Sequence, residues 1–163
     1  ITAKSDPVFG AVYKLVAVHK DKAIIPKIKV SETFEKITNP GRKGVYRVYD
    51  PNGHAIADLL TMEDEKPVDG EEFHFVDTHR PWKRLSFTGC NFKELQELVL
   101  KNGKRTKPSP SLESIRNFVK IQLVNEIWPE EQRFANPHIH YLDMSPTYYK
   151  MKMTLLEDAK RVK

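Results

Sequence analysis

The spacing of hydrophobic positions changes once along the chain, and this change predicts the fold. Before residue 108, short runs rich in Val, Ile, Tyr and Phe alternate with turn residues, a pattern typical of β-strands and hairpins. After Pro108, apolar residues recur every three or four positions, as they do on one buried face of a helix. The pattern predicts an α+β fold, with antiparallel β-strands and hairpins in the first two-thirds, followed by two amphipathic helices packed on the sheet.

Turn residues divide the first part of the chain into its expected strands. The Asp-Pro-Asn-Gly sequence at 50–53 is the clearest hairpin signal, because Asn and Gly accept the positive φ that tight turns need. Asn-Gly at 102–103 predicts a second hairpin with a type I′ turn, and Asp-Lys at 21–22 fits a turn as well. Pro26 indicates an edge strand or a bulge, and the acidic segment 63–72 a surface loop. The strands are expected over residues 8–19, 23–30, 45–49, 55–61, 73–76, 82–88, 95–101 and 104–107.

Capping residues mark where the helices are expected to begin. Ser109 or Ser111 can cap the first helix, which Pro129 stops near Trp128. Ser145, followed by a proline, repeats this start signal for the last helix. The expected buried stripes are Leu112, Ile115, Phe118, Val119, Leu123 and Ile127 in the first helix, and Tyr148, Met151, Leu155 and Ala159 in the last.

The length of 163 residues suits one domain with a hydrophobic core, and no boundary inside the chain is sharp. We therefore expect residues 1–163 to form one region, β-rich over 1–88 with a basic loop at 29–47, and with a hairpin and the helices over 89–163. No apolar run approaches the roughly 20 residues that span a bilayer, and no secretory signal is evident. The single cysteine, Cys90, excludes an internal disulfide and fits a reducing cytoplasm.

The charge balance favours an anionic partner. The chain has 27 Lys and Arg residues against 22 Asp and Glu, a formal net charge of +5, which suits either a phosphate ligand or a nucleic acid. The basic hairpin at 101–107 lacks the interleaved aromatic residues of a nucleic-acid surface, so a solvated hairpin tip is the better interpretation. His138 and His140 would share one side of a strand and could hold a metal, but no third ligand lies nearby in sequence. A loop with two histidines is the simpler interpretation.

A second group of cations is more informative. These cations are spread along a turn-rich segment. In this segment, Pro40, Gly41 and Gly44 are expected to leave backbone amides open to an anion. The cations of this group are Lys27, Lys29, Lys36, Arg42, Lys43 and Arg47. Phosphate binding needs this combination of fixed positive charge and exposed N–H donors. From composition alone, an ordinary basic loop is still the simpler interpretation.

Several ordered blocks of sequence cover nearly the whole chain. The first is Phe-Gly-Ala-Val-Tyr-Lys-Leu-Val at 9–16, and the others are Lys-Val-Ser-Glu at 29–32, Glu-Lys-Ile-Thr at 35–38, Pro-Gly-Arg-Lys-Gly-Val-Tyr-Arg at 40–47, Ala-Asp-Leu-Leu at 57–60, Pro-Trp-Lys-Arg at 81–84, Pro-Ser-Leu-Glu-Ser-Ile-Arg at 110–116, Trp-Pro-Glu at 128–130 and Asn-Pro-His at 136–138. In this order and spacing they resemble the C-terminal portion of nicotinate phosphoribosyltransferases. The visible departure is Ala11, where the family usually has a second glycine.

The resemblance implies an activity for a longer protein. Members of the family carry a split α/β N-terminal domain, an irregular α/β barrel and a C-terminal extension. They join nicotinate to phosphoribosyl pyrophosphate in NAD salvage, giving nicotinate mononucleotide and pyrophosphate. ATP hydrolysis, with Mg, is coupled through a phosphorylated histidine, so the chemistry is of glycosyltransferase and ligase type. The phosphate-binding loop and the catalytic histidine lie before the segment that matches residue 1, so the isolated chain is expected to be inactive and to bind no cofactor.

The resemblance also implies a binding role for four cations. Related nicotinamide-using enzymes are dimers in which basic residues of one subunit reach the active site of the other. Lys14, Lys29, Arg42 and Lys43 lie in the corresponding segments and are expected to contact phosphate groups and neutralise departing pyrophosphate. Lys14 also interrupts an otherwise apolar expected strand. No catalytic or metal-binding residue is expected, and the expected partners are the rest of the enzyme and a second copy in a cytoplasmic homodimer, without nucleic acid or membrane.

Two alternatives stay open. In the first, the chain is a structural and dimerisation domain whose lysines are merely solvated. In the second, it is a small basic β domain that binds nucleic acid, which explains the charge but not the ordered sequence blocks. Because the resemblance places the start of the chain near a barrel strand, an exposed apolar patch is expected over residues 1–18, as a site for self-association.

Overall fold

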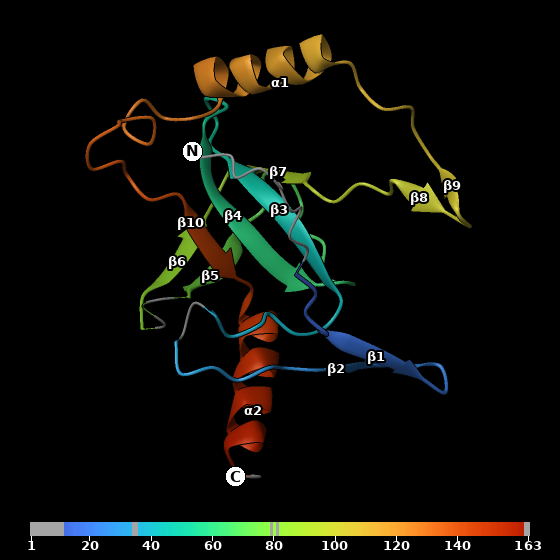
Figure 1. Ribbon diagram of the computed structural model, residues 1–163. Helices are drawn as coiled ribbons and strands as arrows, with labels where there is room; N and C mark the ends of the chain where they lie inside the picture. Colours follow the sequence, from blue (N-terminus) through green and yellow to red (C-terminus); the bar gives the residue numbers. More distant parts are fainter. Residues whose placement is uncertain (1–11, 34–35, 79, 81, 162–163) are drawn as a thin grey trace. The chain divides into compact units, whose positions relative to one another are not determined.

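The computed structural model describes residues 12–33, 36–78, 80 and 82–161. The chain divides into two compact units, the first made of Ile1–Arg42 together with Lys152–Lys163, and the second of Lys43–Met151. Nine of the ten described strands lie before residue 106, and the helices α1 (Leu112–Asn125) and α2 (Pro146–Arg161) follow (Figure 1). The α+β class expected from the sequence is confirmed.

A mixed six-stranded sheet forms the centre of the second unit. Its strand order is β6-β5-β10-β4-β3-β7, with β10 parallel to β4 and the other neighbours antiparallel. The strands are β3 (Lys43–Tyr49), β4 (Ala55–Met62), β5 (Phe73–Asp77), β6 (Arg84–Phe87), β7 (Asn91–Glu94) and β10 (Tyr141–Met144). The strands expected at 45–49, 55–61, 73–76 and 82–88 are confirmed. The sequence pattern does not predict β7 or β10, and β10 makes the sheet mixed rather than wholly antiparallel.

Both expected Asn-Gly turns close hairpins. In the turn between β3 and β4, the Asp50 carboxylate accepts hydrogen bonds from the amides of Asn52 (2.9 Å) and His54 (2.8 Å). Asn102 and Gly103 have φ values of 50° and 74°, as a type I′ turn requires, and join β8 (Leu100–Lys101) to β9 (Lys104–Arg105). This second hairpin is shorter than expected, because β8 and β9 form a sheet of two strands with no wider sheet to extend them.

The core of the second unit comes from the alternating pattern that predicts its strands. Every second residue of β3 is buried, and its neighbours are half-buried. One buried cluster consists of Tyr46, Val48, Leu59, Phe75 and Cys90, and another of Leu60, Met144 and Tyr148. Burial raises the pKa of the Cys90 thiol and so favours its protonated form, as expected for a structural cysteine.

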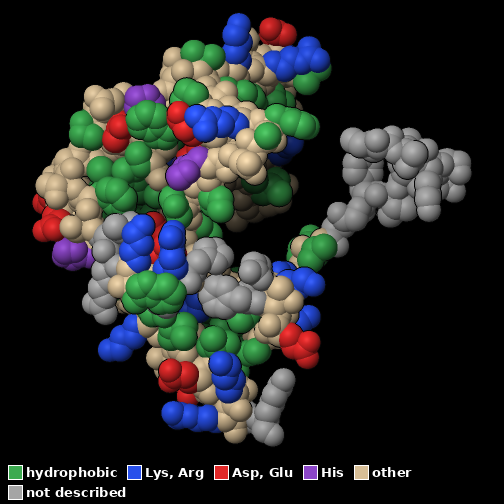
Figure 2. Space-filling view, turned by 90° about the vertical axis from the view of Figure 1, so that its left-hand side faces the viewer, with side chains coloured by type: hydrophobic (Ala, Val, Ile, Leu, Met, Phe, Trp, Pro, Cys, Tyr) green, Lys and Arg blue, Asp and Glu red, His purple; other side chains and the backbone are tan. Residues whose placement is uncertain are grey.

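Both helices begin where the sequence predicts. Ser111 caps α1, its Oγ accepting the amide of Ser114 at 3.1 Å, and Ser145 Oγ accepts the amide of Tyr148 at 3.2 Å at the start of α2. The two helices differ in burial. Tyr148 and Leu156 of α2 are buried, whereas none of the residues of α1, all of which are described, is buried. The packing on the sheet that the apolar stripe predicts is therefore not observed for α1, and hydrophobic side chains are visible at the top of Figure 2, where α1 lies in Figure 1.

The first unit contains a separate two-stranded hairpin. Strands β1 (Ala17–Lys20) and β2 (Ala23–Pro26) are joined by Asp21 and Lys22, whose φ values are 49° and 73°. Pro26, which has no N–H to donate, is the last paired residue of β2, so the strand expected over 23–30 is shorter. The strand expected over 8–19 is wrong for residues 12–16, which lie outside β1, and residues 8–11 are outside the described part. Residues 12, 13 and 15 are exposed hydrophobic side chains, as expected for the described part of that patch.

Candidate functional site

Three segments of the first unit meet at one backbone carbonyl group. The oxygen of Val16 accepts hydrogen bonds from the amides of Lys27 (2.8 Å) and Gly41 (2.7 Å). Lys14 lies two residues before Val16, and Arg42 directly follows Gly41. The bonds therefore bring the segments that carry Lys14 and Arg42 to the segment around Lys27, although these segments are far apart in sequence.

Lys29 is held to the same loop by a second pair of hydrogen bonds. Its amide donates to Thr38 Oγ1 at 2.8 Å, and the Thr38 amide donates to the Lys29 carbonyl at 3.4 Å. Thr38 is buried, so these bonds fix the backbone on the inner side of the loop. Residues 14–16, 27–29 and 38–42 are called the basic segments below.

The four cations expected to bind phosphate are not equivalent. Lys14, Lys29 and Arg42 are exposed and belong to the basic segments. Lys43 is half-buried at the start of β3, in the other unit, and burial lowers its pKa. The expectation that Lys14 interrupts an apolar strand is wrong, because no strand partner pairs with residues 12–16 among the described residues. Backbone hydrogen bonds thus bring together the segments that carry three of the four expected residues.

The glycines of the loop do not present open amides. The Gly41 amide is bonded to Val16, and Gly44 is buried in β3 opposite Thr61. A Cβ atom on Gly44 would lie 2.6 Å from Thr61 Oγ1 and 2.6 Å from Tyr46 Cε2, so close packing explains this glycine. Any anion at the basic segments would therefore meet side-chain cations rather than a cradle formed by these glycine amides.

A buried lysine that the sequence did not single out lies in the same unit. Lys152 of α2 is 6% exposed, and its Nζ donates to Asn39 Oδ1 at 2.7 Å. Burial lowers the pKa of this ammonium group. Lys152 lies one helical turn after Tyr148 and one turn before Leu156, on the same side of the helix. This spacing was the signal in the sequence that could have predicted its burial. Its contact ties the C-terminal helix to the residue before Pro40.

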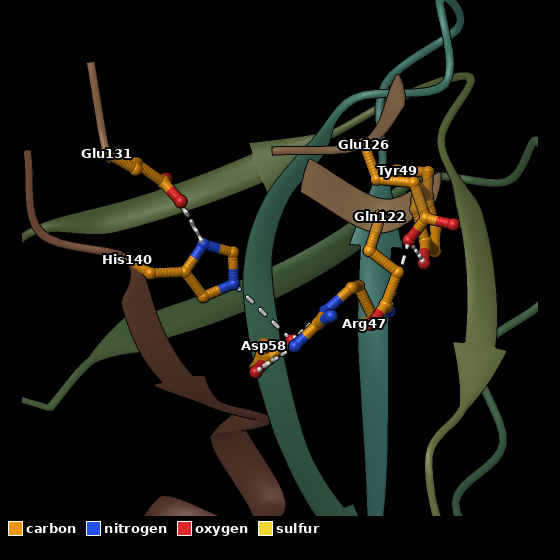
Figure 3. A network of polar contacts seen from close by, with 7 residues as sticks. All are labelled: Arg47, Tyr49, Asp58, Gln122, Glu126, Glu131 and His140. Atoms are coloured by element: carbon orange, nitrogen blue, oxygen red, sulfur yellow. Dashed lines mark hydrogen bonds and ion pairs between the residues drawn. The ribbon is translucent and has the colours of Figure 1, made fainter. Parts of the chain in front are cut away.

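A network of charges crosses the sheet of the second unit (Figure 3). Arg47 on β3 binds Asp58 on β4 through two hydrogen bonds, from Nε to Oδ1 at 2.9 Å and from a terminal nitrogen to Oδ2 at 3.1 Å. His140, just before β10, lies between Asp58 (3.4 Å from Nε2) and Glu131 (3.2 Å from Nδ1). Arg47 is thus committed to an internal partner and does not join the cations expected to bind phosphate.

The pKa shifts in this network follow from its contacts. Burial alone would raise the pKa of Asp58, but interactions with His140 and Arg47 together lower it. Interaction with Asp58 raises the pKa of His140, and Glu131 adds to the effect while burial opposes it. The network favours the ionised form of Asp58 and links β3 and β4 to the residue just before β10.

The two histidines considered as possible metal ligands have different surroundings. His138 is exposed and contacts the ring of Tyr141 edge-on at 5.9 Å, whereas His140 belongs to the ion network. Within the part of the chain that the structure describes, His, Cys, Asp and Glu form no group of three or more that could hold a metal ion. Both histidines lie outside the strands, in the segment before β10.

A buried acidic pair lies on the neighbouring strands β5 and β10. Asp77 and Asp143 face each other in the antiparallel register and are each 3% exposed. The Arg80 amide donates to Asp77 Oδ1 at 2.9 Å, and Arg80 Nε donates to Oδ2 at 3.1 Å. Burial and then the charge of Asp77 raise the pKa of Asp143 to about 6. Asp143 is therefore a carboxyl group whose ionisation disfavours the fold.

The strands and helices described above form an α+β fold with a mixed sheet. Sequence comparison assigns the chain to a family. The model of the nicotinate phosphoribosyltransferase C-terminal domain matches residues 42–152. The chain belongs to this family. It is 32% identical to nicotinate phosphoribosyltransferase of Bacillus subtilis over 98% of its length, and 31% identical to that of Caenorhabditis elegans over 95%.

The matched relatives are much longer than this chain, which spans 33% of the Bacillus protein and 27% of the Caenorhabditis protein. The fold is also similar to that in the crystal structure of human nicotinic acid phosphoribosyltransferase, with a TM-score of 0.67 and 21% sequence identity. That likeness covers 72% of this chain and 23% of the human chain. None of the described helices is both long and apolar enough to cross a membrane.

Proposed function

We propose that the chain serves as the C-terminal domain of an enzyme that joins nicotinate to phosphoribosyl pyrophosphate in NAD salvage. The products are nicotinate mononucleotide and pyrophosphate, and ATP and Mg act as substrates of the complete cytoplasmic enzyme. The catalytic histidine and the sugar-phosphate loop are contributed by polypeptide outside this chain, so the 163 residues alone do not turn over substrate. Family membership and the names of the matched relatives support this proposal.

Within that enzyme, Lys14, Lys29, Arg42 and Lys43 contact phosphate groups, and the domain supports a homodimer in which they reach the partner's active site. For Lys14, Lys29 and Arg42, the observation that supports this role is the Val16 carbonyl, which gathers the basic segments through two backbone bonds. Cations carried on neighbouring backbone segments would neutralise the charge that develops on a departing pyrophosphate. They act electrostatically and transfer no proton.

Steady-state kinetics of the full-length enzyme test the assignment. Lys14→Ala and Lys43→Ala each remove one charge-assisted contact, so KM for phosphoribosyl pyrophosphate should rise about tenfold or more. Lys20→Ala is a matched control, because Lys20 is an exposed lysine of β1 outside the basic segments. Unchanged kinetics in both test variants would contradict the phosphate role.

The same variants separate the alternatives. If the domain were purely structural, Lys14→Ala and Lys43→Ala would change the melting temperature or the oligomer size and leave KM unchanged. If it bound nucleic acid, the 163-residue chain would bind an oligonucleotide tightly and with strong salt dependence. The proposal predicts neither result.

A further inference from the structure

Helix α1 presents an apolar surface that no other described part of the chain buries. Its exposed large side chains are between 43% and 71% accessible, and they are Leu112, Ile115, Phe118, Val119, Ile121, Leu123 and Val124. Exposed apolar surface on a folded domain, when it is extensive, marks an interaction surface. The helix is a candidate for such a surface. Its N-cap and the spacing of its apolar residues are those of an amphipathic helix, yet none of its residues is buried.

The C-terminal end of the helix is attached to the sheet by hydrogen bonds. Glu126, the C-cap residue, accepts a hydrogen bond from Tyr49 Oη at 2.7 Å through its side chain, and one from the Ala55 amide at 2.8 Å through its carbonyl. Gln132 Nε2 donates to the carbonyl oxygens of Leu123 (2.7 Å) and Ile127 (3.0 Å), which satisfies the last turn. These contacts anchor the C-terminal end of α1 to the hairpin of β3 and β4, while its apolar side stays uncovered.

The chemistry of the surface limits what can cover it. A shallow groove on α1 is lined by Ile115, Val119, Leu123 and Val124, together with Arg116 and Lys120. The two cations lie one helical turn apart, on the same side of the helix. A cationic surface would be repelled by these two side chains. The groove instead suits an apolar surface edged with carboxylates.

One source of such a surface is covalently attached in the relatives. The family match, residues 42–152, includes α1, and the chain corresponds to only 33% and 27% of the two relatives described above. We propose that α1 docks through this groove onto the part of the same enzyme that lies outside this chain, at an apolar surface flanked by Asp or Glu. The inference rests on the chain's place in a longer enzyme, and not on its phosphate contacts.

Thiol labelling of the full-length enzyme tests this docking. Val119→Cys places a probe in the groove, and Asn125→Cys, on the same helix but outside the groove lining, is the control. Peptide-resolved mass spectrometry would follow maleimide modification in the full-length enzyme and in the 163-residue chain, over a hundredfold range of protein concentration. We expect Val119→Cys to react at least tenfold more slowly in the full-length enzyme at every concentration, and Asn125→Cys to react at similar rates in both proteins.

Two results would overturn the docking proposal. Equal rates for Val119→Cys in the two proteins would mean that nothing in the enzyme covers the groove. Protection that appears only as concentration rises would mean that a second copy covers it. Acetylation rates of Lys120 and Lys104 in the unsubstituted enzyme give an answer without any variant, since Lys120 lines the groove and Lys104 lies in the exposed β9. Neither readout depends on phosphoribosyl pyrophosphate, so failure of the phosphate role would leave the result interpretable.

Discussion

Charged side chains are organised differently in the two units of the chain. In the basic segments, backbone hydrogen bonds to Val16 and Thr38 fix the chain, and Lys14 and Lys29 extend into solvent. Within the described residues, neither of these lysines forms an ion pair. In the sheet, Arg47 and Asp58 pair across neighbouring strands and are mostly buried. Among the described residues, Lys14 and Lys29 have no ion-pair partner to lose on meeting an anion, whereas Arg47 is paired with Asp58.

The largest effect on the free energy of unfolding is expected from the side chains that are buried in one unit and exposed in the other. Leu59 is fully buried in the sheet, so Leu59→Ala should lower the free energy of unfolding by about 2–5 kcal/mol. Val18 on β1 is 37% exposed, and Val18→Ala should cost well under about 1 kcal/mol. Urea denaturation of the 163-residue chain would measure both. A loss at Val18 as large as that at Leu59 would contradict the view that the hairpin contributes little to the core.

The buried acidic pair gives a pH-dependent prediction for the sheet unit. The pKa of Asp143 is raised from 3.8 to about 6, so the protonated carboxyl supports the fold fully below pH 4. This stability is lost as the pH rises towards 6, by an amount on the order of 2 kcal/mol. Asp143→Asn should remove that loss and be more stable than the original chain at pH 7.

Melting temperatures at pH 4, 5, 6 and 7 would check the Asp143 prediction. Asp64→Asn, in the exposed loop after β4, is the control and should leave the pH profile unchanged. A profile for Asp143→Asn with the same slope between pH 4 and 6 as the original chain would show that Asp143 is not the titrating group.

A smaller effect is expected from the ion network. Arg47→Met leaves Asp58 with only His140 as a partner, and should destabilise the chain by about 1–2 kcal/mol because the side chains are about four-fifths buried. The exposed Lys107–Glu97 pair, with both side chains 64% accessible, offers a contrast, and Lys107→Met should cause no measurable loss. Equal losses in the two variants, measured by urea denaturation, would remove the distinction between paired and solvated charges.

The smallest expected effect on stability lies at the basic segments. Lys14→Ala and Lys29→Ala should change the free energy of unfolding by less than about 0.5 kcal/mol, because both side chains are exposed. Thermal unfolding of the two variants would check this. A marked drop in melting temperature would indicate that these lysines hold the fold, and would favour the structural alternative.

Local signals in the sequence predicted the parts of the fold that local chemistry determines. The turn at 50–53, the type I′ turn at 102–103 and the caps at Ser111 and Ser145 all appear as expected. The hairpin at 50–53 also placed Arg47 opposite Asp58, and this pairing could have been deduced from the register of the two strands. In each case a few adjacent residues carry the information.

The remaining features depend on contacts that no local pattern encodes. Strand β10 has four residues and joins the sheet beside β4, so neither its parallel direction nor the position of His140 could be deduced locally. Burial of Lys152 depends on Asn39, far away in sequence. The exposure of α1 has another origin, because an apolar stripe predicts that a surface will be covered but not which part of the protein covers it.

Binding of phosphoribosyl pyrophosphate to the full-length enzyme tests the central claim most directly. Isothermal titration of Lys29→Ala should show an affinity reduced about tenfold or more, with the melting temperature unchanged. Lys20→Ala, an exposed lysine in the same unit, should bind as tightly as the unsubstituted enzyme. Equal affinity for Lys29→Ala and Lys20→Ala would contradict the account, since the basic segments would then be a solvated surface rather than part of a phosphate site.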